Sequence, residues 1–139
     1  MAIEYPVKMT VTLEPVQSPC ITVTAGNIVY EQQLSATTSF DFEFHTVDQA
    51  SLIIEHHSKS DLDPNTAVII RCIEFYGISD PRFIWAGTYY PTYPDHYTDQ
   101  KSSLPGQDYL GWNGTYVLKF QVPVFSWMHQ VQGLGWIYQ

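Results

Sequence analysis

Hydrophobic and polar residues alternate along much of the chain, and the clearest case is the stretch SFDFEFHT at residues 39–46. Its three phenylalanines fall on one side of the alternation, while its two acidic residues and its histidine fall on the other. A period of two is what a β-strand with one buried face requires. The pattern therefore predicts a half-buried strand here.

Similar segments follow one another along the chain, separated by turn residues such as prolines and the Ala-Gly-Asn of residues 25–27. The segment 66–78 is apolar on both faces, which favours a central place in a sheet. Two prolines in 82–94 place the second half of that segment at an edge or in a loop. Strands are predicted within residues 8–14, 19–24, 28–34, 39–46, 50–58, 66–78, 82–94 and 111–125.

Helical periodicity is almost absent. One or two helical turns are predicted at 124–131, a long polar loop at 95–110, and a turn at the Asn-Gly pair 113–114. About eight short antiparallel strands with at most one short helix predict an all-β protein. We expect a single β-sandwich domain of jelly-roll type over residues 1–139.

The charge of the chain narrows the choice of partners. The formal net charge is −8, and the six Lys and Arg residues are scattered along the sequence. Because no basic patch can neutralise phosphates, neither nucleic acid nor an anionic membrane surface is an expected partner. Cations, neutral glycans and basic protein surfaces remain open. The stretch 1–14 lacks the apolar core of a signal peptide, and no apolar run reaches the about 18 residues of a membrane span.

The two cysteines, Cys20 and Cys72, are too few for a Cys-rich metal site or a disulfide framework. A single bridge between them is allowed by the sequence but is not implied by it. Cys72 lies inside an apolar run, which favours a small buried hydrophobic residue.

The polar stretch EHHSKSDLDPNT, residues 55–66, carries the candidate metal ligands. Asp61, Asp63 and Asn65 occupy alternate positions, as in the first half of an oxygen-ligand calcium loop. The second half of an EF-hand does not follow, because Thr66 and Cys72 stand where that loop has glycine and glutamate. The sequence leaves two interpretations open: a calcium site, or a turn in which the Asp and Asn side chains cap backbone amides.

The adjacent histidines, His56 and His57, point to opposite faces if they lie on a strand, so they cannot chelate one metal ion together. No spacing of the five histidines supports zinc. We expect one of this pair to face the core and to form a hydrogen bond with a neighbour, while the other faces solvent.

Catalytic signatures are lacking in the sequence, which has no G-x-S-x-G elbow and no cysteine-protease signature. Glu55 and Glu74 could supply a glycosidase carboxylate pair, but both fall within predicted strands and nothing sets their separation. We therefore do not expect an enzyme.

Aromatic residues flank the predicted polar loop and form the candidate binding surface. Exposed aromatic rings stack on sugars and also anchor protein interfaces, whereas some of these rings could instead fill the core. The candidates are Trp85, Tyr89, Tyr90, Tyr93, Tyr97, Tyr109 and Trp112.

Four segments in this order carry a resemblance: HSKSDLDPNT (57–66), AVIIRCIEFYGI (67–78), YYPTY (89–93) and LGWNGTYVLKFQVPVFSWM (110–128). The chain resembles small β-sandwich proteins of tailed bacteriophages, especially marine and cyanobacterial phages, which are similar to calcium-dependent xylan-binding modules. The resemblance implies a non-enzymatic subunit located in the virion.

Three functions follow from these observations. The first hypothesis is a phage structural protein, a capsid decoration (cement) or tail accessory subunit that forms homo-oligomers and contacts other virion proteins. The alternative is a calcium-assisted carbohydrate-binding module that uses Asp61, Asp63 and Asn65 near the exposed aromatics. The second alternative is an enzyme acting on polysaccharide.

Overall fold

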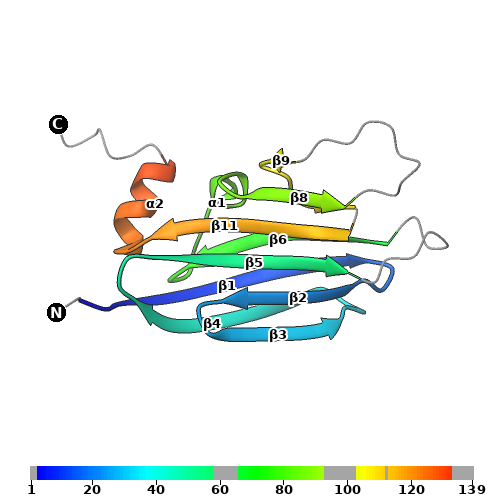
Figure 1. Ribbon diagram of the computed structural model, residues 1–139, viewed down its shortest axis with the longest axis horizontal. Coiled ribbons are helices and arrows are strands. Elements are labelled where there is room, and N and C mark those ends of the chain that lie inside the picture. Colours follow the sequence, from blue (N-terminus) through cyan, green and yellow to red (C-terminus); the bar gives the residue numbers. More distant parts are fainter. Residues whose placement is uncertain (1–2, 58–65, 93–102, 112, 133–139) are drawn as a thin grey trace.

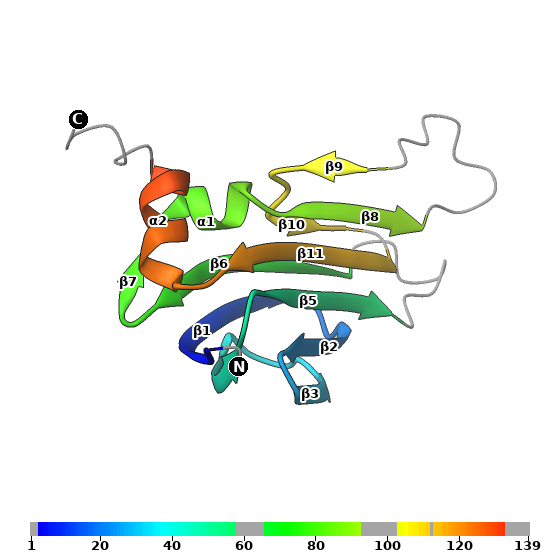
Figure 2. The same cartoon turned by 60° about the vertical axis from the view of Figure 1, so that its left-hand side comes forward.

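The computed structural model describes residues 3–57, 66–92, 103–111 and 113–132. Two antiparallel sheets pack face to face, with two short helices at one end (Figure 1, Figure 2). Sheet A has the strand order β10-β6-β1-β4, with β7 also paired to β6, and sheet B has the order β3-β2-β5-β11-β8-β9. The predicted β-sandwich is confirmed.

The elements of sheet A are β1 (Tyr5–Val16), β4 (Thr38–Thr46), β6 (Ala67–Phe75), β7 (Ile78–Ser79) and β10 (Tyr109–Leu110). Those of sheet B are β2 (Cys20–Ala25), β3 (Ile28–Gln33), β5 (Gln49–His57), β8 (Thr88–Thr92), β9 (Leu104–Pro105) and β11 (Asn113–Gln121). The helices are α1 (Pro81–Trp85) and α2 (Val124–Gln132).

The alternation in β4 sets which side of sheet A faces the core. Phe42 is fully buried, and it pairs across the sheet with Met9 of β1, which is 1% exposed. Cross-strand partners share a face, so the two strands present one continuous apolar surface. Alternate residues of β2, β5 and β11 cover that surface from sheet B, as their periodicity predicts.

The prediction that β6 is central is confirmed, because β6 lies between β1 and β10. The burial of Cys72 is a wrong prediction: this residue is half-buried and its thiol lies 3.5 Å from Glu74 Oε1. The physical reason is a register shift between Thr12 and Leu13 of β1. Such a bulge adds one residue to the facing strand, so that Arg71 and Cys72 both stay out of the core. Cys72 and Cys20 are both free thiols.

Two helices are present in the described residues, where at most one was expected. The predicted helix at 124–131 is confirmed as α2. The unexpected one, α1, begins after Asp80, whose carboxylate accepts a hydrogen bond from the Arg82 backbone N–H, and it has Pro81 in its first turn. A single helical turn is too short to show a period of 3.6 residues, and the aromatic residues of 82–85 read equally well as strand.

The strands also outnumber the expected eight, because β7, β9 and β10 have two residues each and carry no periodic signal. The region 95–110 was predicted as one polar loop, yet β9 and β10 lie within it. The Asn-Gly pair was predicted as a turn, yet Asn113 and Gly114 lie inside β11, paired with Thr92 and Pro91. Within the described residues, no helix has the length and apolar character needed to cross a lipid bilayer.

An aromatic cluster holds both helices to the end of the sandwich. The ring of Phe75 lies 5.5 Å from that of Phe83 in α1, 5.3 Å from that of Trp127 in α2 and 5.1 Å from that of Phe120 in β11. These centroid distances and the tilted geometries are typical of favourable edge-to-face contacts. The cluster therefore joins both sheets to both helices.

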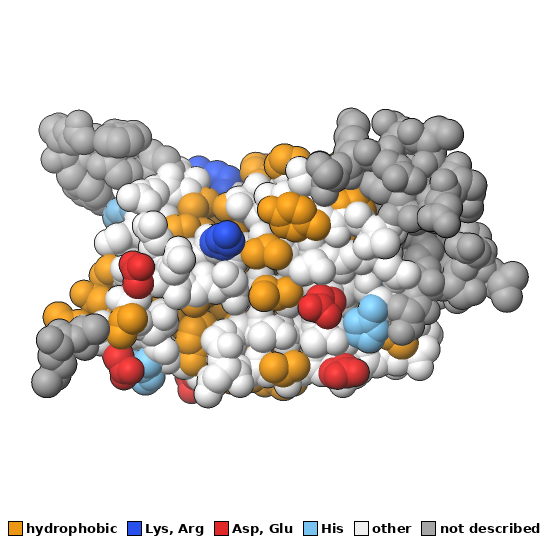
Figure 3. Space-filling view, viewed as in Figure 1, with side chains coloured by type: hydrophobic (Ala, Val, Ile, Leu, Met, Phe, Trp, Pro, Cys, Tyr) orange, Lys and Arg blue, Asp and Glu red, His pale blue; other side chains and the backbone are white. Residues whose placement is uncertain are grey.

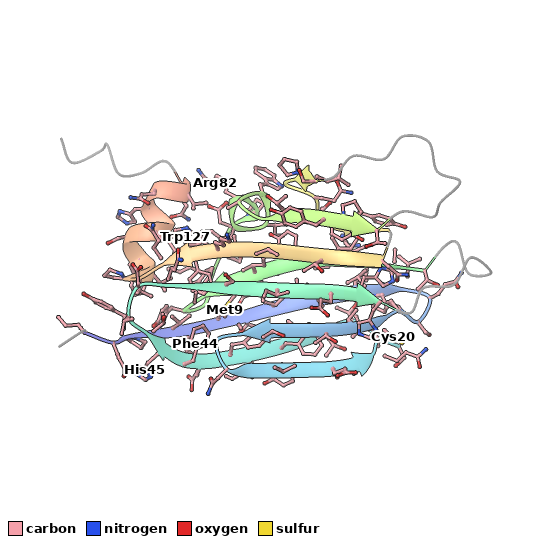
Figure 4. All side chains as sticks on the ribbon, viewed as in Figure 1. Met9, Cys20, Phe44, His45, Arg82 and Trp127 are labelled. Carbon is pink, nitrogen blue, oxygen red and sulfur yellow. The ribbon has the colours of Figure 1, made fainter. Side chains whose placement is uncertain are left out.

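A polar clamp formed by Asp80, Arg82 and Gln132 reinforces this end (Figure 4 labels Arg82 and Trp127). Arg82 donates to both carboxylate oxygens of Asp80 and, over 2.6 Å, to the backbone carbonyl of Gln132. The Gln132 side-chain amide donates to Asp80 Oδ2 over 2.9 Å. These bonds, first among them those from Arg82, hold the pKa of the Asp80 carboxyl well below its usual range.

We predict that Asp80→Asn lowers the free energy of unfolding by about 1 kcal/mol at pH 7, because it weakens charge-assisted bonds to a partly exposed arginine. Asparagine keeps the N-cap. Since folding depresses the pKa of Asp80, its contribution is present above the unfolded pKa of about 3.9 and is lost as the pH falls toward the folded value. Urea unfolding at pH 7 and pH 3 should show a difference between wild type and variant that shrinks at pH 3. Glu31→Gln, on an exposed strand, is the control, and a pH-independent difference would contradict the clamp.

Candidate functional site

The predicted calcium ligands Asp61, Asp63 and Asn65 lie outside the described residues, so calcium binding at these positions stays a prediction. The described structure ends before them at His57 and resumes at Thr66. Thr66 is 4% exposed, and its hydroxyl has no hydrogen-bond partner among the residues that the structure describes. Among the described residues, no group of three or more His, Cys, Asp or Glu side chains is placed to hold a metal ion.

The described strand ends show where the remaining segments attach. The register pairs His56 of β5 with Gly114 of β11, and Asn113 with Thr92 of β8. The end of β5, the end of β8 and the start of β11 therefore meet at one end of sheet B, on the right in Figure 1. The segments that join the sheet here carry all the predicted site residues outside the described part: Asp61, Asp63, Asn65, Tyr93, Tyr97 and Trp112.

The prediction that one of the adjacent histidines faces the core and bonds a neighbour is confirmed, whereas the other, His57, is half-buried. His56 is 1% exposed, and its Nδ1 lies 3.0 Å from the carbonyl oxygen of Leu110 in sheet A. His57 points the other way, where its Nε2 lies 3.0 Å from the hydroxyl of Thr22. The pair therefore bridges structural elements on two faces of β5 and cannot chelate one ion.

The carboxylates considered for catalysis are kept apart by the sandwich. Glu55 lies on the outer face of sheet B, whereas Glu74 lies on the outer face of sheet A, where it pairs with Thr10. Glycoside hydrolysis needs two carboxyl groups on either side of one bond. Glu55 and Glu74 face away from each other and cannot form such a pair.

The aromatic candidates divide into core and surface residues. Tyr89 is a wrong prediction for the binding surface, because it is 1% exposed and belongs to the core. Trp85, Tyr90 and Tyr109 are exposed to 58%, 50% and 44%. Neighbouring residues of a strand point to opposite faces, so the burial of Tyr89 in β8 puts Tyr90 outside.

The three exposed aromatics do not form one platform. Tyr90 pairs with Thr115 and lies on the outer face of sheet B, whereas Tyr109 pairs with Ile69 and lies on the outer face of sheet A. In the described part of the chain, no ring contact joins Trp85, Tyr90 and Tyr109 to one another. Aromatic residues that lie close together in the sequence are therefore distributed over different faces of the sandwich, with Tyr90 on sheet B and Tyr109 on sheet A.

The outer face of sheet B carries an uncharged row of side chains that the sequence did not reveal. The row crosses five strands, and each member is the register partner of the next. Its first member is Thr88 of β8, and Tyr90 lies two residues further along β8 on the same face. Figure 3 shows hydrophobic side chains running down the middle of this face. We call this row the sheet B strip; it consists of Thr88, Val117, Ile53, Thr24 and Val29.

A groove of about 580 Å³ lies beyond the turn between β2 and β3. Its walls come from that turn and from the end of β4 with the start of β5, and Figure 4 shows Phe44 and His45 at this end of the sandwich. The lining residues are Thr24, Gly26, Asn27, Glu43, Phe44, His45, Thr46, Gln49, Ala50, Ser51 and Ile53. We call it the hairpin groove.

The hairpin groove exists because β2 is shorter than its neighbour. The last pair between the two strands is Ala25 with Leu52, whereas β5 begins three residues earlier at Gln49. The chain turns at Gly26, whose φ of 60° suits glycine. A Cβ at that position would lie 2.6 Å from Cγ of Phe44, so the turn rests directly on the ring.

Comparison with known proteins bears on the fold. No protein-family model and no curated protein sequence matches the chain. A solved structure of vCBM60 in complex with galactobiose has a TM-score of 0.54 and 12% sequence identity, covering 80% of this chain and 96% of that one. The selenomethionine form of vCBM60 has a TM-score of 0.55 and 13% identity, covering 81% and 89%; it is described in the context of two families of calcium-dependent carbohydrate-binding modules linked by circular permutation. The chain has the fold of a carbohydrate-binding module.

We predict that substitution of the two neighbouring tyrosines of β8 changes the stability by very different amounts. Tyr89→Ala should lower the free energy of unfolding by about 3–5 kcal/mol, because it removes a large buried ring. Tyr90→Ala should change it by less than about 0.5 kcal/mol, because that ring lies at the surface. Denaturant unfolding measures both values, and equal effects would show that the assignment of the two faces is wrong.

Proposed function

We propose that this chain is a non-catalytic glycan-binding module whose ligand lies along the outer face of sheet B. The observation that carries the proposal is the half-exposed ring of Tyr90 at one end of the uncharged sheet B strip. The sandwich fold shared with vCBM60 supports it, since that protein was solved with galactobiose bound.

The chemistry of this face suits a neutral oligosaccharide. An aromatic ring packs against the apolar C–H face of a sugar, while threonine hydroxyls can donate to and accept from sugar hydroxyls. Neighbouring strands lie about 4.8 Å apart, so the four intervals of the strip span about 19 Å. That length favours an oligosaccharide chain over a single sugar. The absence of Lys and Arg from the strip itself disfavours polyanionic glycans.

Calcium would act at the end of sheet B where β5 and β8 end, which is the end away from the two helices. Asp61, Asp63 and Asn65 offer carboxylate and amide oxygens, which are the ligands that calcium prefers. The segment that carries them joins sheet B beside the end of the strand that holds Tyr90. We therefore include calcium as an aid to glycan binding in the proposal.

The virion role expected from the sequence resemblance, with its location and its protein partners, stays a prediction. Protein contact and glycan binding are separable by experiment, because the glycan proposal makes Tyr90 essential and the virion role does not. The enzyme alternative loses its carboxylate pair, since Glu55 and Glu74 lie on opposite outer faces.

We predict that Tyr90→Ala weakens glycan binding by at least about tenfold, because the proposed site has this one exposed aromatic ring among its described residues and loss of an aromatic anchor is costly in other interfaces. A glycan array identifies a neutral oligosaccharide that binds, and isothermal titration calorimetry measures the change in Kd. Tyr109→Ala is the matched control, because Tyr109 is similarly exposed but lies on the outer face of sheet A. Equal losses in both variants, or silence across the array, would contradict the proposal.

We further predict that chelation of calcium weakens the same binding, and that the double variant Asp61→Asn, Asp63→Asn binds the ion at least about tenfold more weakly because two charged ligands are lost. Calorimetry with calcium alone, and then with the array ligand in EGTA, provides the measurement. Glu31→Gln, an acidic residue of exposed strand β3, serves as the control. Unchanged calcium affinity in the double variant would rule out these two ligands.

A further inference from the structure

We infer that the hairpin groove is a second binding site, distinct from the Tyr90 end of the strip, and that it takes a neutral sugar unit. Its volume of about 580 Å³ lies within the roughly 300–1,000 Å³ of small-molecule pockets. The ligand class rests on the proposed function, whereas the site itself rests on the groove.

The polar groups of the groove are available for a ligand. Within the described residues, the side chains of Asn27, Gln49 and Ser51 form no hydrogen bond with the protein. Amides and hydroxyls offer donors and acceptors together, which matches the hydroxyl groups of a sugar. Thr46 is already used, because its hydroxyl donates to the Gln49 carbonyl over 3.1 Å and fixes the wall of the groove.

The charges of the groove disfavour other small ligands. No Lys or Arg is among its lining residues, so an anion would find no fixed positive partner. The one carboxylate, Glu43, faces Lys8 at 3.8 Å, and both side chains are well exposed. A single solvent-exposed carboxylate is too weak to select a cation. A neutral, hydroxyl-rich ligand remains.

The floor of the groove is apolar and fixed. Phe44 is 9% exposed and is covered by the Gly26 turn, while Ala50 lies beside it on β5. A rigid apolar floor under unpaired polar side chains is the usual arrangement of a small-ligand site. The site is thus largely formed before any ligand arrives.

The groove is continuous with the sheet B strip. Thr24 and Ile53 belong to both, because they lie in the strip and also line the groove. A glycan lying along the strip toward β2 and β3 therefore passes the mouth of the groove. This arrangement suits a branch or a chain end entering the groove while the rest of the glycan stays on the flat face.

The test is a titration of the ¹⁵N-labelled protein with galactobiose, followed through backbone amide shifts. We expect the amides of Gly26, Asn27 and Ser51 to shift. The double variant Asn27→Ala, Gln49→Ala should weaken this response by about tenfold, since it removes two ligand hydrogen bonds. Both residues are exposed and neither has a positive φ, so alanine is compatible with the backbone and the variant should fold. Gln32→Ala, an exposed glutamine of β3 outside the groove, should leave the response unchanged.

The outcomes separate this inference from the proposed function. Shifts confined to Tyr90, Thr115 and Val117 would leave glycan binding intact and overturn the groove as a site. If the amides of neither region shift, the groove is overturned as a binding site. If, in addition, no glycan on the array binds, the proposed function is overturned as well. An extended peptide could instead pair with residues 49–51 of β5, which β2 does not reach. Such binding would survive the double variant, because strand addition uses backbone groups. A response to such a peptide and not to the sugar would also overturn the inference.

Discussion

Burial of alternate side chains between two sheets is the constraint on which the rest of this molecule depends. Phe42 and its neighbours in β4 can reach the core from one side of the strand alone, and the same holds for β1, β5 and β11. Every residue between two core positions is thereby assigned to an outer face. Recognition is left to the two outer faces, the strand edges and the connections at the ends. The helices do not change this division, because Phe83 of α1 and Trp127 of α2 join the same core.

The two outer faces differ in character. Sheet A displays charged side chains at its surface, including the ion pair of Arg71 with Glu14 at 2.6 Å and the weaker pair of Lys8 with Glu43. Sheet B has an uncharged row with charged residues beside it, an aromatic ring at its Thr88 end, and a groove that adjoins it at Ile53 and Thr24. Water is displaced at lower cost from the second kind of surface, because few charges have to lose their hydration. The net charge of −8 therefore says little about the ligand, since Glu31, Glu55 and Lys119 lie in the rows beside the strip on this face and not in the strip itself.

The longer strands and α2 were predictable from the sequence because each is long enough to repeat its hydrophobic period. The sandwich followed from the number of such strands. The sequence prediction missed α1, β7, β9 and β10, which are too short to repeat any pattern. It also grouped Tyr89 with Tyr90, although adjacency on a strand separates side chains by the thickness of the sheet. The groove was hidden for another reason: the Ala-Gly-Asn turn was visible, but its position relative to Leu52 depends on pairing between strands far apart in sequence. The exposure of Cys72 depended on a bulge opposite β1, which is equally non-local.

The early end of β2 has a consequence for how this surface can change. A hairpin longer by two residues in each strand would continue the register of Ala25 with Leu52 onto Ser51 and Ala50, and sheet B would then extend over the groove. Neither sheet's core would have to be repacked, because the added residues would sit at the rim. Loop insertions at surface turns are well tolerated. Length variation at one turn could thus create or remove the proposed groove site in a single step, while substitutions in the strip would change the proposed binding face one side chain at a time.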